Sequence, residues 1–316
     1  MKPVSTNTLF KHCYGRYAIA AVNVFNMEQV HALFAAAQAS NAPIIVQLTP
    51  AARNYGHPEM LHAMVTAAAN IYPDVVHAIH LDHGNEAHAA SAIAAGYNAV
   101  MIDASHDPFE QNVARTKAVV DMAHASGIAV EAELGVLAGV EDDLSVDEAH
   151  AKYTDAAQAK SFVTQTQCDS LAVAVGTSHG AYKFSGKQGL QFDVLQQIQQ
   201  ALPGFPLVLH GASLVDPATI ENINQHGGKL RQDASGVSVD ALQKAIQLGI
   251  CKVNIATDLR LLWASVYRTF FHTQPDQFDP VLPGKTYMQA CQQLLAERFE
   301  VLGASGKAAE LKTIIA

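Results

Sequence analysis

Residues 75–84 read VVHAIHLDHG, and this stretch is the strongest single indication of the fold. Its first part, residues 75–81, has the length and the β-branched content of a buried strand. Asp82 and His83 follow at once, and Gly84 allows close approach of another piece of backbone. An acid and an imidazole at a strand end suit a metal site with a proton-transfer group beside it. Taken alone, a capping Asp next to a hydrogen-bonded His explains these residues equally well.

Seven further apolar runs repeat this pattern, and longer stretches with helical spacing separate them. The eight expected strands are residues 18–24, 43–48, 75–81, 99–102, 129–134, 170–175, 207–209 and 251–255. The expected helices include residues 27–40, 58–70, 86–95, 108–126, 155–166 and 237–248, followed by a C-terminal helix over 286–303. Such an alternation is typical of βαβ units around a parallel sheet.

No Pro- or Gly-rich linker and no change in composition divides the eight units. We therefore predict one domain, residues 1–316, folded as a single (β/α)8 TIM barrel with extra C-terminal helices, in preference to a doubly wound open sheet. Active-site residues of such barrels lie at the carboxyl ends of the strands. The expected strands end in polar or glycine residues: Asn23; Gln47 and Thr49; Asp82 and His83; Asp103; Glu133; 176–179; His210 and Gly211; and 254–257.

The composition excludes several classes of protein. Hydrophobic residues make up 49% and charged residues 16%, so the chain can bury a large core and is not disordered. A net charge of -9 argues against a nucleic-acid partner or an anionic membrane surface. The first ten residues lack the apolar run of a signal peptide, so we expect a cytoplasmic location. The four cysteines are far apart and predict neither a disulfide framework nor a zinc knuckle.

Two more histidines lie at later strand ends, in GTSHG (176–180) and LHGAS (209–213). In a barrel, His83, His179 and His210 therefore converge on one face. Three neutral nitrogen ligands leave one coordination position of Zn²⁺ open for a substrate, as a Lewis-acid catalyst requires. The Gly and Ser residues around the last two histidines can offer N–H and hydroxyl groups to a phosphate.

Carboxylates complete the candidate site. Asp103 ends one strand, and Glu131 and Glu133 share a strand parity that points both toward one side. Glu141 lies in an acidic segment, residues 135–154, that we interpret as a mobile lid. The alternatives are a hydrogen-bonded core carboxylate for Glu131 or Glu133, and a solvated loop charge for Glu141.

The motifs LDHGN, MIDAS, VEAELG followed by EDD, GTSHGAYKF, VLHGAS and CKVNIATDLR occur in this order along the chain. In this respect the sequence resembles the class II fructose- and tagatose-bisphosphate aldolases, from residue 23 to the C-terminal helix. The resemblance implies catalytic Zn²⁺ on His83, His179 and His210, a second divalent position on Asp103 and Glu133, and room for a monovalent cation.

The same resemblance implies roles for the remaining residues. Asp82 matches the proton donor and Glu141 the acid/base residue of the mobile loop. The positions that match substrate contacts are Thr49, Gly180, Gly211, Ala212, Ser213, Asn254, Ile255, Ala256 and Thr257. Arg260 is a candidate contact for a distal phosphate, and a surface salt bridge explains it at least as well. The implied reaction is reversible, zinc-dependent cleavage of a ketose 1,6-bisphosphate to dihydroxyacetone phosphate and an aldehyde, by a homodimer or homotetramer.

Three alternatives stay open. Ala256 replaces the Asp usual in the fructose-bisphosphate subtype, so tagatose 1,6-bisphosphate competes with fructose 1,6-bisphosphate as the substrate; Thr49 and Ala212 are milder changes. Lys252 is the candidate for a metal-free Schiff-base mechanism, although it lies near the start of its strand. The third alternative is a non-catalytic protein that binds metal or sugar phosphate. Such a protein would not need the acid/base residues Asp82 and Glu141, and both are present.

Overall fold

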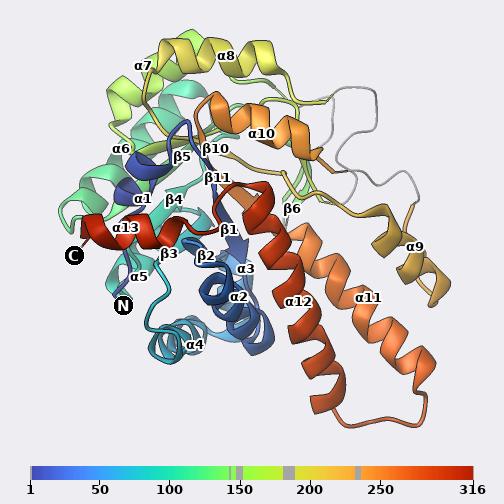
Figure 1. The fold of residues 1–316 in the computed structure, drawn as a ribbon. Coiled ribbons are helices and arrows are strands. Elements are labelled where there is room, and N and C mark those ends of the chain that lie inside the picture. Colours follow the sequence, from blue (N-terminus) through green and yellow to red (C-terminus); the bar gives the residue numbers. More distant parts are fainter. Residues whose placement is uncertain (1, 142–143, 147–151, 181–188, 232–235, 316) are drawn as a thin grey trace.

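The computed structural model describes residues 2–141, 144–146, 152–180, 189–231 and 236–315, and its centre is a closed barrel of parallel strands (Figure 1). The barrel order is β1-β11-β10-β8-β5-β4-β3-β2, so β1 pairs with both β2 and β11. This closure confirms the TIM barrel and excludes the open sheet. The strands are β1 (Ile19–Asn23), β2 (Ile44–Leu48), β3 (His77–Gly84), β4 (Ala99–Ile102), β5 (Ala129–Leu134), β8 (Ser170–Val173), β10 (Leu207–Leu209) and β11 (Ile250–Ile255).

The helices surround the barrel on its outer side (Figure 1). Those that match the predicted ranges are α2 (Met27–Ser40), α4 (Pro58–Ile71), α5 (Glu86–Ala94), α6 (Phe109–His124), α7 (Ala156–Thr166), α10 (Val239–Gln247) and α12 (Val281–Val301). The described residues also form α1 (Thr6–Cys13), α3 (Pro50–Gly56), α8 (Phe192–Ala201), α9 (Pro217–Gln225), α11 (Thr257–Thr273) and α13 (Lys307–Ile315). None of the described helices combines the length and the apolar character needed to cross a bilayer.

The barrel strands are buried along almost their whole length, because helices cover their outer face and their inner face lines the packed interior of the barrel. Apolar side chains fill the layer between strands and helices, whereas the interior also holds polar and charged side chains. The helices α11 and α12 pack against each other and form a long hairpin that extends from the barrel, and α12 also packs on α2 (Figure 1).

A small second sheet lies beside the barrel. It has the order β7-β6-β9 and consists of β6 (Ala138–Glu141), β7 (Leu144–Val146) and β9 (Ser178–His179). The segment interpreted as a lid therefore contains two short strands in its described part. Because Gly139 lies opposite His179 in the register, β6 brings the backbone of the acidic segment next to the strand that carries this histidine.

Candidate active site and metal centre

The strand β3 continues past Leu81, where the sequence pattern ended it, and carries Asp82 and His83 into the barrel opening. Its register with β4 shifts between Leu81 and Gly84. His83 adopts a φ of 49°, a left-handed conformation that is uncommon for a residue other than glycine. Such irregularities re-aim a side chain and are frequent beside functional sites. The local backbone thus turns the Asp82 and His83 side chains in different directions.

The His83 ring points toward two acids from neighbouring strands. Its Nδ1 lies 2.8 Å from Asp103 Oδ2 and 4.0 Å from Glu133 Oε2. The backbone N–H and hydroxyl of Ser105 donate to the other Asp103 oxygen, Oδ1. Burial raises the pKa of Asp103, but the bonds from His83 and Ser105 outweigh it and hold that pKa below its ordinary value. Asp103 is therefore an ionised acceptor.

His210 follows β10 and lies close to His83, with ring centroids 4.7 Å apart and planes at 74°. It is fully buried. Its Nε2 bonds to Glu131 Oε1 at 2.9 Å, and its Nδ1 lies 3.4 Å from Glu133 Oε2. Burial lowers the pKa of His210, an effect that the hydrogen bond to Glu131 partly opposes. A neutral imidazole, the form that binds a metal, is thereby favoured.

Asp82 is held by amide side chains from β1 and β11. Asn23 Nδ2 donates to Asp82 Oδ2 at 2.8 Å, and Asn254 Nδ2 donates to Oδ1 at 3.3 Å. Gln47 Nε2 in turn donates to Asn23 Oδ1 at 3.0 Å. All four side chains are buried. This chain of bonds fixes the orientation of Asp82 beside the two histidines.

The loop after β10 passes very close to the backbone of β9. Gly211 has a φ of 60°, and a Cβ atom at this position would lie 2.5 Å from the carbonyl oxygen of Ser178. Only glycine fits there without a shift of the backbone. The neighbouring Ala212 and Ser213 are buried. The glycine therefore holds the Gly211–Ser213 loop against the strand that ends in His179, and Gly180 follows that strand.

The last predicted contacts lie where α11 and α3 begin. Asn254 and Ile255 end β11, and α11 starts at Thr257 with Ala256 as an N-cap that offers no side-chain hydrogen bond. Arg260 is exposed one turn later, with its guanidinium carbon 4.9 Å from the centre of the Phe25 ring. Thr49 caps α3, since its hydroxyl accepts from Ala52 N.

The donor atoms suit a divalent metal. Two groups of three residues each offer ligand atoms within 4.8 Å of one another: Asp82, His83 and His210, and His83, Asp103 and Glu133. Imidazole nitrogens with carboxylate oxygens are a donor set for Zn²⁺ and for similar divalent ions. The side chains of His179 and Glu141 lie outside the described part of the structure, so their predicted roles stay predictions.

Three buried polar residues at this site, Asn23, Gln47 and His80, have no role that the sequence predicts, and for Lys252 the sequence suggests only a Schiff base. Asn23 and Gln47 end their strands, but only the structure reveals their chain of bonds to Asp82. His80 and Lys252 lie deeper in the barrel, where both contact Glu131. Strand parity was the available signal, since a polar residue two positions before a site residue points into the same interior.

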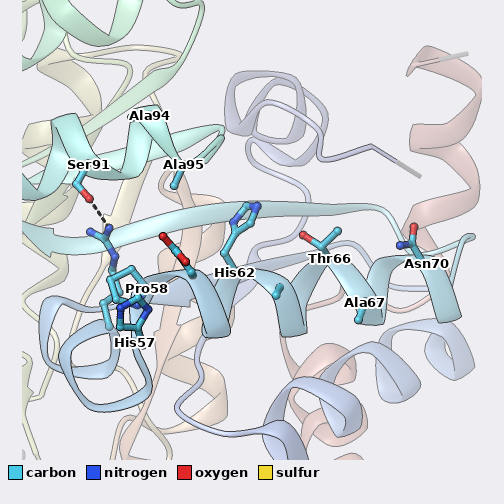
Figure 2. Close-up of a pocket in the computed structure, with 12 residues that line it drawn as sticks. His57, Pro58, His62, Thr66, Ala67, Asn70, Ser91, Ala94 and Ala95 are labelled. Carbon is cyan, nitrogen blue, oxygen red and sulfur yellow. Dashed lines mark hydrogen bonds between the residues drawn. The ribbon is translucent and has the colours of Figure 1, made fainter.

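A cavity of about 880 Å³ lies elsewhere, on the outer side of the barrel (Figure 2). We call it the outer groove; its lining includes His62 and Asn70 of α4, Ser91 of α5, Arg53 of α3, and His57, which precedes α4. None of the predicted site residues lines it. The chemistry of the donor atoms, rather than the size of a cavity, therefore identifies the candidate site.

Comparisons with known proteins agree with this geometry. A family described as "Fructose-bisphosphate aldolase class-II" matches residues 4–307. The chain is 39% identical to a fructose-bisphosphate aldolase of Giardia intestinalis over 96% of this chain and 93% of that protein. It is 40% identical to one of Thermus caldophilus over 92% of this chain and 95% of that protein.

A solved structure gives the same result. The YdjI aldolase of Escherichia coli K12 superposes with a TM-score of 0.77 at 30% identity, over 97% of this chain and 99% of that chain. The family match, the identities and the barrel all cover nearly the whole chain, and the two clusters of histidine and carboxylate can hold the divalent metal that this family uses. The chain therefore belongs to the class-II fructose-bisphosphate aldolase family.

Proposed function

We propose that residues 1–316 form one aldolase domain that reversibly cleaves fructose 1,6-bisphosphate to dihydroxyacetone phosphate and glyceraldehyde 3-phosphate, with Zn²⁺ as the catalytic metal. The observation that carries the proposal is the convergence of His83 and His210, from two different strands, beside an immobilised Asp82. The names of the relatives from Giardia intestinalis and Thermus caldophilus support the choice of substrate. We also expect a homodimer or homotetramer, which light scattering would measure.

In this proposal His83, His179 and His210 hold the catalytic metal, and Asp103 and Glu133 form a second divalent position. The bound metal would polarise the substrate carbonyl and stabilise the enediolate that remains when the carbon–carbon bond breaks. The protein contributes the orientation of its ligands, because Asp103 fixes the His83 ring and Glu131 the His210 ring. A monovalent cation is a further candidate cofactor.

Asp82 and Glu141 would carry the protons. During cleavage, Asp82 takes the proton from the hydroxyl oxygen that becomes the aldehyde oxygen. The carbon–carbon bond breaks, its electron pair moves to the dihydroxyacetone phosphate half, and Glu141 delivers a proton to that carbon. The amides of Asn23 and Asn254 both donate to Asp82 and so hold its carboxyl group in a fixed orientation.

The substrate would lie between the Gly211–Ser213 loop and the start of α11. The phosphate of dihydroxyacetone phosphate can bind to the backbone N–H groups of Gly180, Gly211, Ala212 and Ser213. It can also bind to Thr257, at the N-terminus of α11, where no side chain caps the helix. Asn254 Oδ1 is buried and has no hydrogen-bond partner among the described residues, so it can accept from a substrate hydroxyl. Ile255, Ala256, Thr49 and Arg260 would contact the remainder of the sugar phosphate.

Ala256 favours a second candidate substrate, tagatose 1,6-bisphosphate. The methyl group of Ala256 cannot accept a hydrogen bond from the sugar hydroxyls, whereas the Asp usual at this position in the fructose-bisphosphate subtype can. A coupled assay of dihydroxyacetone phosphate release from both bisphosphates measures the preference. A higher kcat/KM for fructose 1,6-bisphosphate supports the proposal, and a higher value for tagatose 1,6-bisphosphate replaces it with the second candidate.

Replacement of Asp82 by Ala tests catalysis against simple binding. We expect cleavage to fall by about 10²–10⁴-fold, the typical contribution of general acid–base catalysis. Zinc content, measured by atomic absorption, should stay at the wild-type level because Asp82 acts on the substrate. Unchanged turnover would refute the assigned role, and a wild-type protein that binds zinc without turnover on either sugar would indicate the non-catalytic binding protein.

A further inference from the structure

Glu131 is a fully buried carboxylate on which three donor groups converge. Its Oε1 accepts from His210 Nε2 at 2.9 Å. Its Oε2 accepts from Lys252 Nζ at 2.7 Å and lies 3.3 Å from His80 Nε2. The four residues come from β5, β11 and β3 and from the end of β10. Their side chains therefore meet inside the barrel, one layer below Asp82 and His83.

The hydrogen bond to Glu131 determines which nitrogen of His210 carries the proton. An ionised carboxylate only accepts hydrogen bonds, so His210 Nε2 must be the donor. A neutral imidazole protonated at Nε2 has its lone pair on Nδ1. That atom lies on the side of Glu133, 3.4 Å from Oε2, and His83 is the adjacent ring. The contact therefore directs the metal-binding nitrogen toward the candidate metal centre.

Lys252 stabilises the Glu131 carboxylate inside the barrel. A buried carboxylate without a counter-charge is strongly unfavourable. Lys252 Nζ donates to Glu131 Oε2, which leaves Oε1 as the acceptor for His210 Nε2. Lys252 is fully buried at ion-pair distance and supplies the opposite charge. Its ammonium is therefore engaged as a donor, which also argues against a Schiff-base role.

We propose that Glu131 and Lys252 are positioning residues for the metal centre: together they fix His210 in the Nε2–H form and thereby raise the affinity of the chain for its divalent metal. The inference rests on the proposed function only in using the same metal site. Neither residue belongs to the ligands assigned above. Hydrogen bonds to metal-binding histidines typically change metal affinity by about 10–100-fold.

The first experiment measures zinc affinity by competition with a chromogenic chelator. The variants are Glu131→Gln, Lys252→Met and, as a matched control on the surface, Glu310→Gln, whose ion pair with Arg16 lies far from the barrel interior. We expect the zinc Kd to rise by about 10–100-fold in Glu131→Gln, by a smaller factor in Lys252→Met, and not in Glu310→Gln. A folded Glu131→Gln variant with a Kd within about twofold of the wild type, well below that range, would overturn the inference.

The second experiment needs no variant and so does not depend on folding. Nitrogen-15 NMR of the metal-free wild-type protein, with His210→Asn as the assignment control, reports which ring nitrogen of His210 is protonated. A proton on Nε2 supports the inference, and a proton on Nδ1 overturns it. The inference and the proposed function can fail separately. If the wild-type protein cleaves neither bisphosphate but the zinc Kd of Glu131→Gln is raised, only the function is refuted. If the wild-type protein cleaves its substrate but the zinc Kd of Glu131→Gln is unchanged, only the inference is refuted.

Discussion

The carboxyl end of the barrel and the outer groove both gather histidines and charged residues, yet only the barrel end has the features of a metal centre. At the barrel end, His83 and His210 each lie within hydrogen-bond distance of a buried carboxylate. In the outer groove, neither His57 nor His62 forms an ion pair with a carboxylate among the described residues, and burial lowers the pKa of His62. Pairing with buried acids therefore distinguishes a metal centre from a cavity with imidazoles.

The basic residues of the two regions differ in the same way. Lys252 makes an ion pair with Glu131 in the barrel interior. Arg53 in the groove is equally buried, but its described partners are neutral: the Ser91 hydroxyl, the His88 carbonyl and the face of Tyr97. These contacts join α3 to α5. Among the described residues, the basic side chain at the barrel end is thus paired with a buried acid, and the one in the groove is not.

The largest predicted effect compares one histidine from each region. His83→Ala removes a proposed metal ligand. Residues that only support a ligand typically change metal affinity by up to about 100-fold, so we expect kcat/KM for fructose 1,6-bisphosphate to fall by more than that factor. His62→Ala, the matched variant in the groove, should keep wild-type activity and zinc content. Steady-state kinetics with metal analysis measures both. Equal losses in the two variants would remove the distinction between the regions.

The next effect concerns stability. Lys252→Met leaves Glu131 buried without its counter-charge, and breaking a buried ion pair typically costs about 3–5 kcal/mol. Arg115→Met breaks a partly exposed pair with Glu86 and Asp107 between α5 and α6, where about 1 kcal/mol or less is expected. Urea unfolding of the metal-free proteins gives both free energies. A smaller loss for Lys252→Met than for Arg115→Met would contradict the assignment of charges.

A smaller effect is expected at Ala256, at the edge of the barrel end. Ala256→Asp adds an acceptor where α11 begins without a side-chain cap. One added hydrogen bond of about 1.4 kcal/mol should shift the ratio of kcat/KM for fructose over tagatose 1,6-bisphosphate about tenfold toward fructose. Competition assays with both sugars measure the ratio. An unchanged ratio would mean that substrate choice is made at other residues, such as Thr49 or Arg260.

The smallest effect is the acid dependence of the surface pair. Hydrogen bonds from Arg115 lower the pKa of Glu86 from 4.5 to about 2. Because the folded-state pKa is depressed, the pair stabilises the fold above about pH 4.5, and this contribution is lost as the pH falls toward 2. The wild type should therefore lose slightly more stability than Arg115→Met between pH 5 and 3, as measured by urea unfolding. Parallel pH profiles would show that the pair contributes nothing.

The sequence predicted the barrel and the strand ends because both depend on local patterns. The parallel strands are buried apolar runs with polar residues after them, and helical spacing separates them. The sequence could not predict the irregularity in β3, because the left-handed φ of His83 depends on packing against β4. It also did not predict the Glu131–Lys252 contact, since β5 and β11 are not neighbours and their side chains meet only after the barrel closes.

The central claim is that a catalytic divalent metal binds between His83 and His210 at the carboxyl end of the barrel. Anomalous diffraction at the zinc absorption edge, from crystals grown with zinc, tests this most directly. We predict a strong peak beside these two histidines, and loss of both this peak and the cleavage of fructose 1,6-bisphosphate after treatment with a chelator. A fully active protein with no peak there, or with its only peak in the outer groove, would contradict the account.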